Sequence, residues 1–276
     1  MEEETINRAQ EPKANLLGVV GGVGPEATNK FCEMIIEKKK KSKDQDNIPF
    51  IHYCNPKIPD RTEFILGKGE NPVPEIVKTC NALEKMGANM LVIPCNTAHV
   101  MLNEIQDQVS VPIINMIDLL VRQIKRDNPN IQKIGILATT GSIHSGLFEN
   151  YLFTQGIESI YSSKEYQEDL VMEAIYGESG IKAGKKSLPR RLLNEAAREL
   201  INKGAQAIIL GCTELPLVMR QSDFDIKLYE PMDVVSEKIV NYIEAIDSIN
   251  KNRLEAEENV VKIMLTINDK IMEVVC

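Results

Sequence analysis

Short, continuous apolar runs alternate along this chain with longer segments in which apolar residues recur at helical spacing. Continuous runs bounded by glycine, proline or polar residues are typical of strands buried on both faces of a parallel sheet. We expect strands over residues 15–22, 48–54, 87–95, 111–116, 134–138, 157–161, 205–210 and 226–229. We expect helices over residues 25–41, 72–85, 143–154, 165–176, 187–203 and 233–249, and one more that ends near 128–129. This alternation predicts an α/β protein with parallel sheets.

One part of the pattern occurs twice. A Gly-Ala pair, two variable positions, three aliphatic residues and one small or turn-forming residue lead to Cys95, and the same arrangement leads to Cys212. Gly18 and Gly135 lie in matching apolar runs upstream, and both are 77 residues from their cysteine (95 − 18 = 77; 212 − 135 = 77). Equal spacing of this kind indicates an internal duplication.

The duplication predicts two pseudo-symmetric α/β domains with mainly parallel four-stranded sheets. Residues 1–118 and 229–276 would form the first domain, which carries Cys95, and residues 119–228 the second, which carries Cys212. Ligands of such sheets bind outside the carboxyl ends of the strands, where both cysteines fall. We therefore expect the active site in the cleft between the domains.

The last segment of the chain has its own periodicity. Its apolar residues fit an amphipathic helix with a spacing near 3.5 residues, at positions 260, 264, 267, 271 and 274 or 275. We expect this tail, residues 250–276, to pack on the body of the protein or on a partner subunit. A disordered tail is the alternative.

Composition narrows the possible functions. The 276 residues are 43% hydrophobic, which is enough for a sizeable core, and 32 basic against 40 acidic residues give a formal charge of −8. This charge argues against nucleic-acid binding, and a small anionic ligand would need a local basic pocket.

No apolar stretch approaches the roughly 18 residues of a membrane span, and the polar, acidic leader does not resemble a signal peptide. We expect a cytoplasmic protein without a membrane partner, whose six cysteines are free thiols.

Two matched cysteines suggest one class of chemistry. A thiolate and a thiol on opposite sides of a carbon can remove a proton from one face and deliver another to the other face, which inverts a stereocentre. Helices expected to start near Ala98 and Pro216 would lower the thiol pKa values toward neutrality. The carbanion-like transition state would also need hydrogen bonds, for which we propose Asn96, Thr97, Thr213, the turn containing Gly22 and Val23, and the turn from Thr139 to Ser142.

Other chemistries fit the sequence less well. Gly22 to Ala27 matches the GxGxxA fingerprint of dinucleotide-binding proteins, but the second strand ends at Cys54-Asn55 without the acidic residue that this fingerprint expects. Histidines at 52 and 99 are too few and too poorly spaced for a metal site. A cysteine hydrolase would pair one cysteine with one histidine, which gives Cys212 no role. A pyridoxal enzyme would need a lysine that forms the Schiff base and a site that binds the phosphate, and the spacing of residues demands neither. We expect neither a cofactor nor a metal.

The chain resembles the aspartate/glutamate racemase family from about residue 15 to residue 245. The motifs that carry this resemblance are Pro94-Cys95-Asn96-Thr97-Ala98-His99, Gly211-Cys212-Thr213-Glu214, the Gly-Gly-x-Gly-Pro-x-Ala-Thr opening at residues 21–28, and Asn55-Pro56-x-Ile58-Pro59-Asp60-Arg61-Thr62, which is similar to the aspartate racemase branch. Val23 stands where the family commonly has Met. The resemblance implies a cofactor-independent amino-acid racemase, usually a homodimer, with two similar α/β domains and the active site between them.

The resemblance also implies roles for individual residues. The catalytic cysteines of the family correspond to Cys95 and Cys212, and Arg61 and Lys182 match the arginine and lysine that would hold the distal carboxylate of aspartate. Without the resemblance, Arg61 would be read as part of a loop-surface ion pair with Asp60, and Lys182 as a solvated loop charge. Asn55, His99 and Glu214 are expected to support the site.

The leading hypothesis is an isomerase that interconverts L- and D-aspartate by two-base proton transfer. A racemase of glutamate or of broad specificity is the first alternative, because one methylene changes binding by only about 1–3 kcal/mol. A non-catalytic amino-acid-binding protein on the same scaffold is the alternative from another class. A thiol-dependent decarboxylase or isomerase of related fold ranks third.

Overall fold

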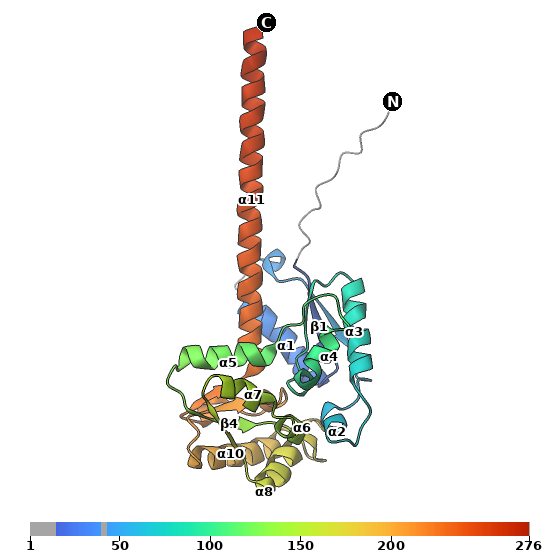
Figure 1. The fold of residues 1–276 in the computed structure, drawn as a ribbon, viewed down its shortest axis with the longest axis vertical. Helices are drawn as coiled ribbons and strands as arrows, with labels where there is room; N and C mark the ends of the chain where they lie inside the picture. The colour runs from blue at the N-terminus through green and yellow to red at the C-terminus, as the bar shows by residue number, and fades with distance from the viewer. Residues whose placement is uncertain (1–14, 40–42, 276) are drawn as a thin grey trace.

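Two parallel sheets form the framework of the protein (Figure 1). The computed structural model describes the backbone of residues 15–39 and 43–275, and side chains as far as residue 253. In this part of the chain the first sheet has the strand order β2-β1-β3 and the second has the order β5-β4-β6-β7, with every pair parallel. The strands are β1 (Leu17–Gly21), β2 (Phe50–Cys54), β3 (Met90–Val92), β4 (Lys133–Leu137), β5 (Glu158–Tyr161), β6 (Ala207–Leu210) and β7 (Lys227–Tyr229).

Helices connect the strands and cover both sheets, as the sequence pattern predicted. They are α1 (Pro25–Lys38), α2 (Arg61–Ile65), α3 (Val73–Lys85), α4 (Leu102–Gln106), α5 (Met116–Asp127), α6 (Thr140–His144), α7 (Leu147–Thr154), α8 (Lys164–Tyr166), α9 (Glu173–Tyr176), α10 (Ser187–Asn202) and α11 (Pro231–Val275). Short 3₁₀ turns occur at η1 (Asp44–Asp46), η2 (Thr97–Met101), η4 (Leu215–Leu217) and η5 (Gln221–Asp223), and η3 (Gln167–Met172) is a π-helical turn between α8 and α9. No helix in the described part of the chain is both long and apolar enough to cross a membrane.

Each sheet is buried on both faces. Apolar residues of α3 and α4 pack on one face of the first sheet, and those of α1 and α11 on the other. In the same way α9 and α10 cover one face of the second sheet, and α5 and α7 cover the other. Because both faces are covered, strand residues such as Leu17, Val19 and Ile134 are fully buried, which explains their continuous apolar runs.

The duplication is visible in the packing of the central strands. A Cβ atom at Gly18 in β1 would overlap the Leu91 side chain and lie 3.0–3.3 Å from the Cβ atoms of Ala88 and Leu83. A Cβ atom at Gly135 in β4 would lie 3.0–3.2 Å from Leu200 and Ala205, which is also tighter than ordinary contact. The three residues of the second set each lie 117 positions after their counterparts in the first (135 − 18, 200 − 83 and 205 − 88 all equal 117). The same close approach of helix to strand therefore occurs in both halves.

The first sheet has three strands, so the prediction of four strands in each sheet is wrong for this half. Residues 111–116 form only an isolated bridge, between Leu91 and Ile113. Pro112 has no N–H group with which to extend the pairing. Two residues after the bridge, the Asn115 side chain accepts hydrogen bonds from the Ile117 and Asp118 N–H groups, so the backbone already turns into α5.

The chain crosses between the halves through α5 and returns through α11. The predicted helix at 233–249 and the amphipathic tail are one helix, α11, whose C-terminal part stands away from the body in Figure 1. Its first part is held at the end of α1, where Lys38 pairs with Asp233 at 2.6 Å and the next residue, Lys39, pairs with Glu244 at 2.8 Å. The predicted packing of the tail concerns side chains beyond residue 253, outside the described residues, and the domain boundaries at 118/119 and 228/229 stay a prediction.

Candidate active site

One small cavity between the two halves is lined by both matched cysteines. Its walls are Val23, Arg61, Thr62, Cys95, Asn96 and Thr97 from the first half, and Thr139, Tyr176, Lys182, Cys212, Thr213 and Glu214 from the second. The cavity measures about 10 Å³, which is close to the least that one water molecule needs. The structure is therefore a closed state, and an amino acid would reach the cysteines only after the walls move apart.

Cys95 follows β3, and the His99 side chain holds its backbone carbonyl group. The Nδ1 atom of His99 lies 2.9 Å from the Cys95 carbonyl oxygen, and the Met116 N–H donates to Nε2 of the same ring at 3.2 Å. Because Nε2 accepts, the proton of the neutral ring is on Nδ1, which donates to Cys95. Burial lowers the pKa of His99, which keeps the ring neutral. His99 thus fixes the backbone at Cys95 and does not enter the cavity.

Arg61 begins helix α2 and brings a positive charge to Cys95. Asp60 caps this helix through the Thr62 and Glu63 N–H groups, which places Arg61 in the first turn. Burial acts to lower the pKa of the guanidinium, but Cys95 and Asp60 outweigh it, and the pKa of Arg61 is raised. Nη1 donates to the Pro59 carbonyl oxygen at 2.9 Å, whereas Nε is buried without a partner.

Cys212 follows β6 and contacts a carboxylate. Its Sγ lies 2.9 Å from Oε2 of Glu214, while Oε1 of the same carboxylate pairs with Nζ of Lys182 at 3.2 Å. Burial raises the pKa of the Cys212 thiol well above its usual value, the negative charge of Glu214 raises it further, and Lys182 opposes this shift. Glu214 is itself only 5% exposed.

The two thiols therefore have opposite electrostatic surroundings. This corrects the prediction that helices starting near Ala98 and Pro216 lower both thiol pKa values. The segments there are the 3₁₀ turns η2 and η4, and only η2 continues into a helix. For Cys212, burial and the Glu214 carboxylate dominate over any helix dipole.

Hydroxyl groups and one amide complete the cavity wall. Thr97 lies 3.2 Å from Thr139 and 2.9 Å from Ser142, measured between their hydroxyl oxygens, so these three hydroxyls form one hydrogen-bonded group across the two halves. Asn96 is 1% exposed, and neither its amide nitrogen nor its amide oxygen has a hydrogen-bond partner. Buried amides without partners are rare, so a ligand that both accepts and donates hydrogen bonds fits this position.

Four of the predicted site residues lie behind the cavity and not on its wall. They are Gly22, Asn55, His99 and Ser142. The Asn55 side chain donates to Thr79 and accepts from the Lys57 N–H, so it shapes the loop before α2. Gly22 has a φ of +87°, and a side chain there would collide with the Asn55 backbone. These residues hold the chain that carries Val23 and Arg61.

Thr62 and Tyr176 line the cavity but were not predicted. The Tyr176 hydroxyl donates to Asp60 at 3.0 Å, and Nζ of Lys182 lies 5.0 Å from the centre of the tyrosine ring. Tyr176 thus joins α9 in the second half to the start of α2 in the first. Thr62 is the last residue of the motif that begins at Asn55, so the motif could have indicated its place in the site. Nothing in the local sequence indicated Tyr176.

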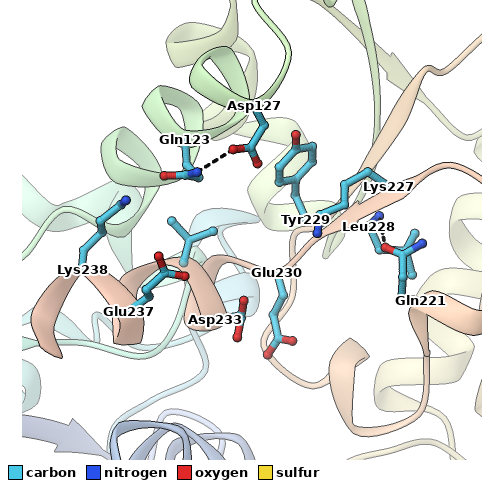
Figure 2. Close-up of a pocket in the computed structure, with 11 residues that line it drawn as sticks. Gln123, Asp127, Gln221, Lys227, Leu228, Tyr229, Glu230, Asp233, Glu237 and Lys238 are labelled. Carbon is cyan, nitrogen blue, oxygen red and sulfur yellow. Dashed lines mark hydrogen bonds between the residues drawn. The ribbon is translucent and has the colours of Figure 1, made fainter. Parts of the chain in front are cut away.

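A second cavity of about 280 Å³ lies away from the cysteines, between α5, β7 and the start of α11 (Figure 2). Gln123 and Asp127 are hydrogen bonded on one wall, and Glu230 lies across from them. Burial and the nearby Asp233 raise the pKa of Glu230 to about 7, although Lys38 and Lys30 oppose the shift.

Comparisons with known proteins agree with the fold. The sequence profile described as Asp/Glu/Hydantoin racemase matches residues 20–239. The chain is 26% identical over 233 residues to the broad specificity amino-acid racemase RacX of Bacillus subtilis (strain 168), which covers 82% of this chain and 97% of that protein.

Solved structures show the same architecture. The aspartate racemase of Picrophilus torridus superposes with a TM-score of 0.74 at 24% identity, covering 83% of this chain and 94% of that chain. The glutamate racemase of Francisella tularensis subsp. tularensis SCHU S4, in complex with D-glutamate, superposes with a TM-score of 0.62 at 18% identity, covering 86% of this chain and 83% of that chain. At these identities the structural likeness establishes the α/β fold with two parallel sheets.

Proposed function

This chain belongs to the Asp/Glu/hydantoin racemase family, and from this membership and its cavity we propose that it interconverts L- and D-aspartate by proton transfer at Cα. The observation that carries the proposal is that Cys95 and Cys212, from equivalent places in the two halves, line the same cavity. A substrate held there would have one sulfur on each side of its Cα. That is the arrangement which inversion by two bases requires.

The reaction would proceed by two proton transfers. One sulfur, as thiolate, takes the proton from Cα, and the electron pair left behind is delocalised into the α-carboxylate. The other sulfur, as thiol, then delivers its proton to the opposite face of Cα. The protonation states of the two sulfurs are exchanged at the end, and the substrate has gained and lost one proton. In each turnover the chain supplies one base and one proton, and we propose that it acts without a cofactor.

Two cations would recognise the distal carboxylate. Arg61 and Lys182 both line the cavity, and Nε of Arg61 has no partner in the closed state. The guanidinium group of arginine can donate two parallel hydrogen bonds to one carboxylate, whereas the ammonium group of lysine acts as a compact positive charge. The unpartnered amide of Asn96 and the hydroxyls of Thr97, Thr139 and Thr213 would take the α-carboxylate and α-ammonium groups. Together these residues form the basic pocket that an acidic substrate needs in a protein of charge −8.

A broad-specificity racemase is the second candidate. It is favoured by the similarity to RacX over 82% of the chain, since that relative is named for broad specificity. Glutamate is the other acidic substrate of proteins with this fold. We propose a homodimer in the cytoplasm for either candidate.

The decisive experiment is isotope exchange without added cofactor. Purified protein incubated with L-aspartate in deuterated water should produce D-aspartate that carries deuterium at Cα, detected by chiral chromatography and mass spectrometry. A panel of other L-amino acids in the same assay separates the two candidates, because a broad-specificity enzyme would label neutral amino acids at comparable rates. Absence of exchange and inversion for every amino acid would reject both.

A further inference from the structure

Glu214 stands at the centre of a hydrogen-bonded group that the two-base scheme does not by itself require. Its carboxylate lies 2.9 Å from Sγ of Cys212, 3.2 Å from Nζ of Lys182 and 3.4 Å from Oγ1 of Thr213. Gly24 leaves the space for it, because a side chain there would come within 2.5 Å of Oε1. The surrounding chain is therefore shaped around this carboxylate.

The partners of Glu214 determine where protons reside. Oε1 of Glu214 forms an ion pair with the Lys182 ammonium, and an ionised carboxylate can only accept hydrogen bonds. The contact between Sγ of Cys212 and Oε2 then needs a proton on the sulfur. A thiolate at that position would face the negative carboxylate at 2.9 Å without a proton between them.

Cys95 has the opposite surroundings. Its charged neighbour on the cavity wall is Arg61, which is 7% exposed and interacts with the Cys95 sulfur. A guanidinium is always protonated and has no acceptor, so it stabilises a thiolate and offers nothing to a thiol proton. As whole residues the two cysteines are equally exposed, at 6% each, so what distinguishes them on the cavity wall is the charge of their neighbours.

We propose that Glu214 is a positioning residue that keeps the proton on Cys212 in the substrate-free protein. Cys95, which lies beside Arg61, is then the sulfur of the pair that is available to act as the thiolate. This inference rests on the proposed function for its consequence: Cys95 is the base and Cys212 the acid in the first turnover. The enantiomer whose Cα–H faces Cys95 then reacts without any prior exchange of protons.

The other charged groups around Cys212 leave this assignment in place. Lys182 acts against it, but its ammonium is paired with Glu214 and lies against the Tyr176 ring. Tyr176 stays neutral, because burial and Asp60 raise the pKa of its hydroxyl. Arg61, across the cavity, acts on Lys182 as a like charge and on Cys95 as an opposite one.

Site-resolved alkylation tests the proposal without any substrate. The full-length protein is treated with limiting iodoacetamide at pH 7, and the carbamidomethylation rates of Cys95 and Cys212 are measured by peptide mass spectrometry. Both sulfurs face the same cavity, so opening of the site affects the two rates alike. We expect Cys95 to react about tenfold faster than Cys212 or more, since the thiolate is the reactive form.

Substitution of Glu214 assigns the effect. In Glu214→Gln the Cys212 rate should rise until the two rates agree within about threefold, because the amide can donate a hydrogen bond to a thiolate. Glu26→Gln is the matched control. Glu26 lines a neighbouring cavity with Lys182 and Glu214, pairs with Lys186, and contacts neither cysteine, so both rates should stay unchanged.

Several outcomes would overturn the inference. Equal rates in the native protein, or a faster Cys212, would do so even if Glu214→Gln failed to fold. An unchanged ratio in folded Glu214→Gln would also do so. The racemase assay on the same preparations separates the two proposals: unequal alkylation without racemisation rejects the proposed function alone, and racemisation with equal alkylation rejects the role of Glu214 alone.

Discussion

The hydroxyl of Tyr176 lies 3.0 Å from Oδ2 of Asp60, and this hydrogen bond joins two residues that are 116 positions apart in the chain. Tyr176 ends α9 in the second half, and Asp60 caps α2 in the first. The same ring lies against the Lys182 ammonium. One side chain thus connects the start of α2, which carries Arg61, to the loop that carries Lys182, on either side of the closed cavity.

Removal of the Tyr176 hydroxyl should weaken the closed state. A hydrogen bond to a charged group contributes about 1.5–3 kcal/mol, so we expect Tyr176→Phe to lower kcat/KM for aspartate about tenfold. Tyr176→Ala should lower it further, because the ring beneath Lys182 is also lost. Steady-state kinetics on both variants would measure the two effects. Equal losses in the two variants would mean that the ring contributes nothing.

Loss of either matched cysteine should abolish racemisation. Cys95→Ala and Cys212→Ala each remove one of the two groups that exchange protons with Cα, and we expect kcat to fall by about 10³-fold or more in each. Cys54→Ser is the control, because Cys54 is an exposed free thiol at the end of β2. Chiral chromatography of the product measures the rates. Full activity in either alanine variant would contradict the two-base scheme.

Arg61 should determine the preference for acidic substrates. Arg61→Ala removes a charge-assisted contact to the distal carboxylate, so kcat/KM for aspartate should fall by roughly 10–100-fold. The rate for any neutral amino acid that the protein accepts should fall much less. Arg122→Ala, which removes an exposed arginine paired with Asp118, serves as the control. An equal loss on acidic and neutral substrates would remove Arg61 from carboxylate recognition.

Glu230 should make stability depend on pH. Its pKa is raised from 4.5 to about 7 in the folded protein, so the folded state binds this proton more tightly than the unfolded state. The resulting stabilisation is present in full below about pH 4.5 and is lost as the pH rises through about 7. Glu230→Gln keeps the neutral form at every pH.

Thermal melting checks this behaviour. We expect the Tm of Glu230→Gln to match that of the native protein at pH 5 and to exceed it by a few degrees at pH 8. Glu237→Gln replaces an exposed carboxylate on the wall of the same cavity and should change Tm equally at both pH values. The same Tm difference for Glu230→Gln at both pH values would contradict the assigned shift.

Most of the framework could be predicted because it depends on local periodicity. The strands β1, β4 and β6 are continuous apolar runs, and burial on both faces produces such runs directly. The duplication placed Cys95 and Cys212 at equivalent strand ends, and their meeting in one cavity follows from that equivalence. The fourth strand of the first sheet was overpredicted because an apolar run does not reveal whether a proline interrupts its pairing.

Contacts between distant side chains could not be predicted in the same way. Tyr176 reaches Asp60 only because α9 and α2 meet across the two halves, and no spacing within either segment indicates it. The sequence places Glu214 near Cys212, because it comes only two residues later. It does not indicate whether the Glu214 carboxylate faces the Cys212 sulfur. That orientation decides whether the thiol or the thiolate is favoured, so the sequence alone led to the wrong pKa direction for Cys212.

The crossing of the chain through α5 and its return through α11 has a mechanical consequence. The two connections contact each other beside Gln123, Asp127 and Asp233, on the walls of one cavity away from the cysteines. Because α5 and α11 lie next to each other, we expect one half of the protein to rotate relative to the other about these two connections, in a hinge motion. Such a rotation would open the cavity that holds the cysteines, because its walls come from both halves, and the reverse rotation would close the walls around a bound amino acid.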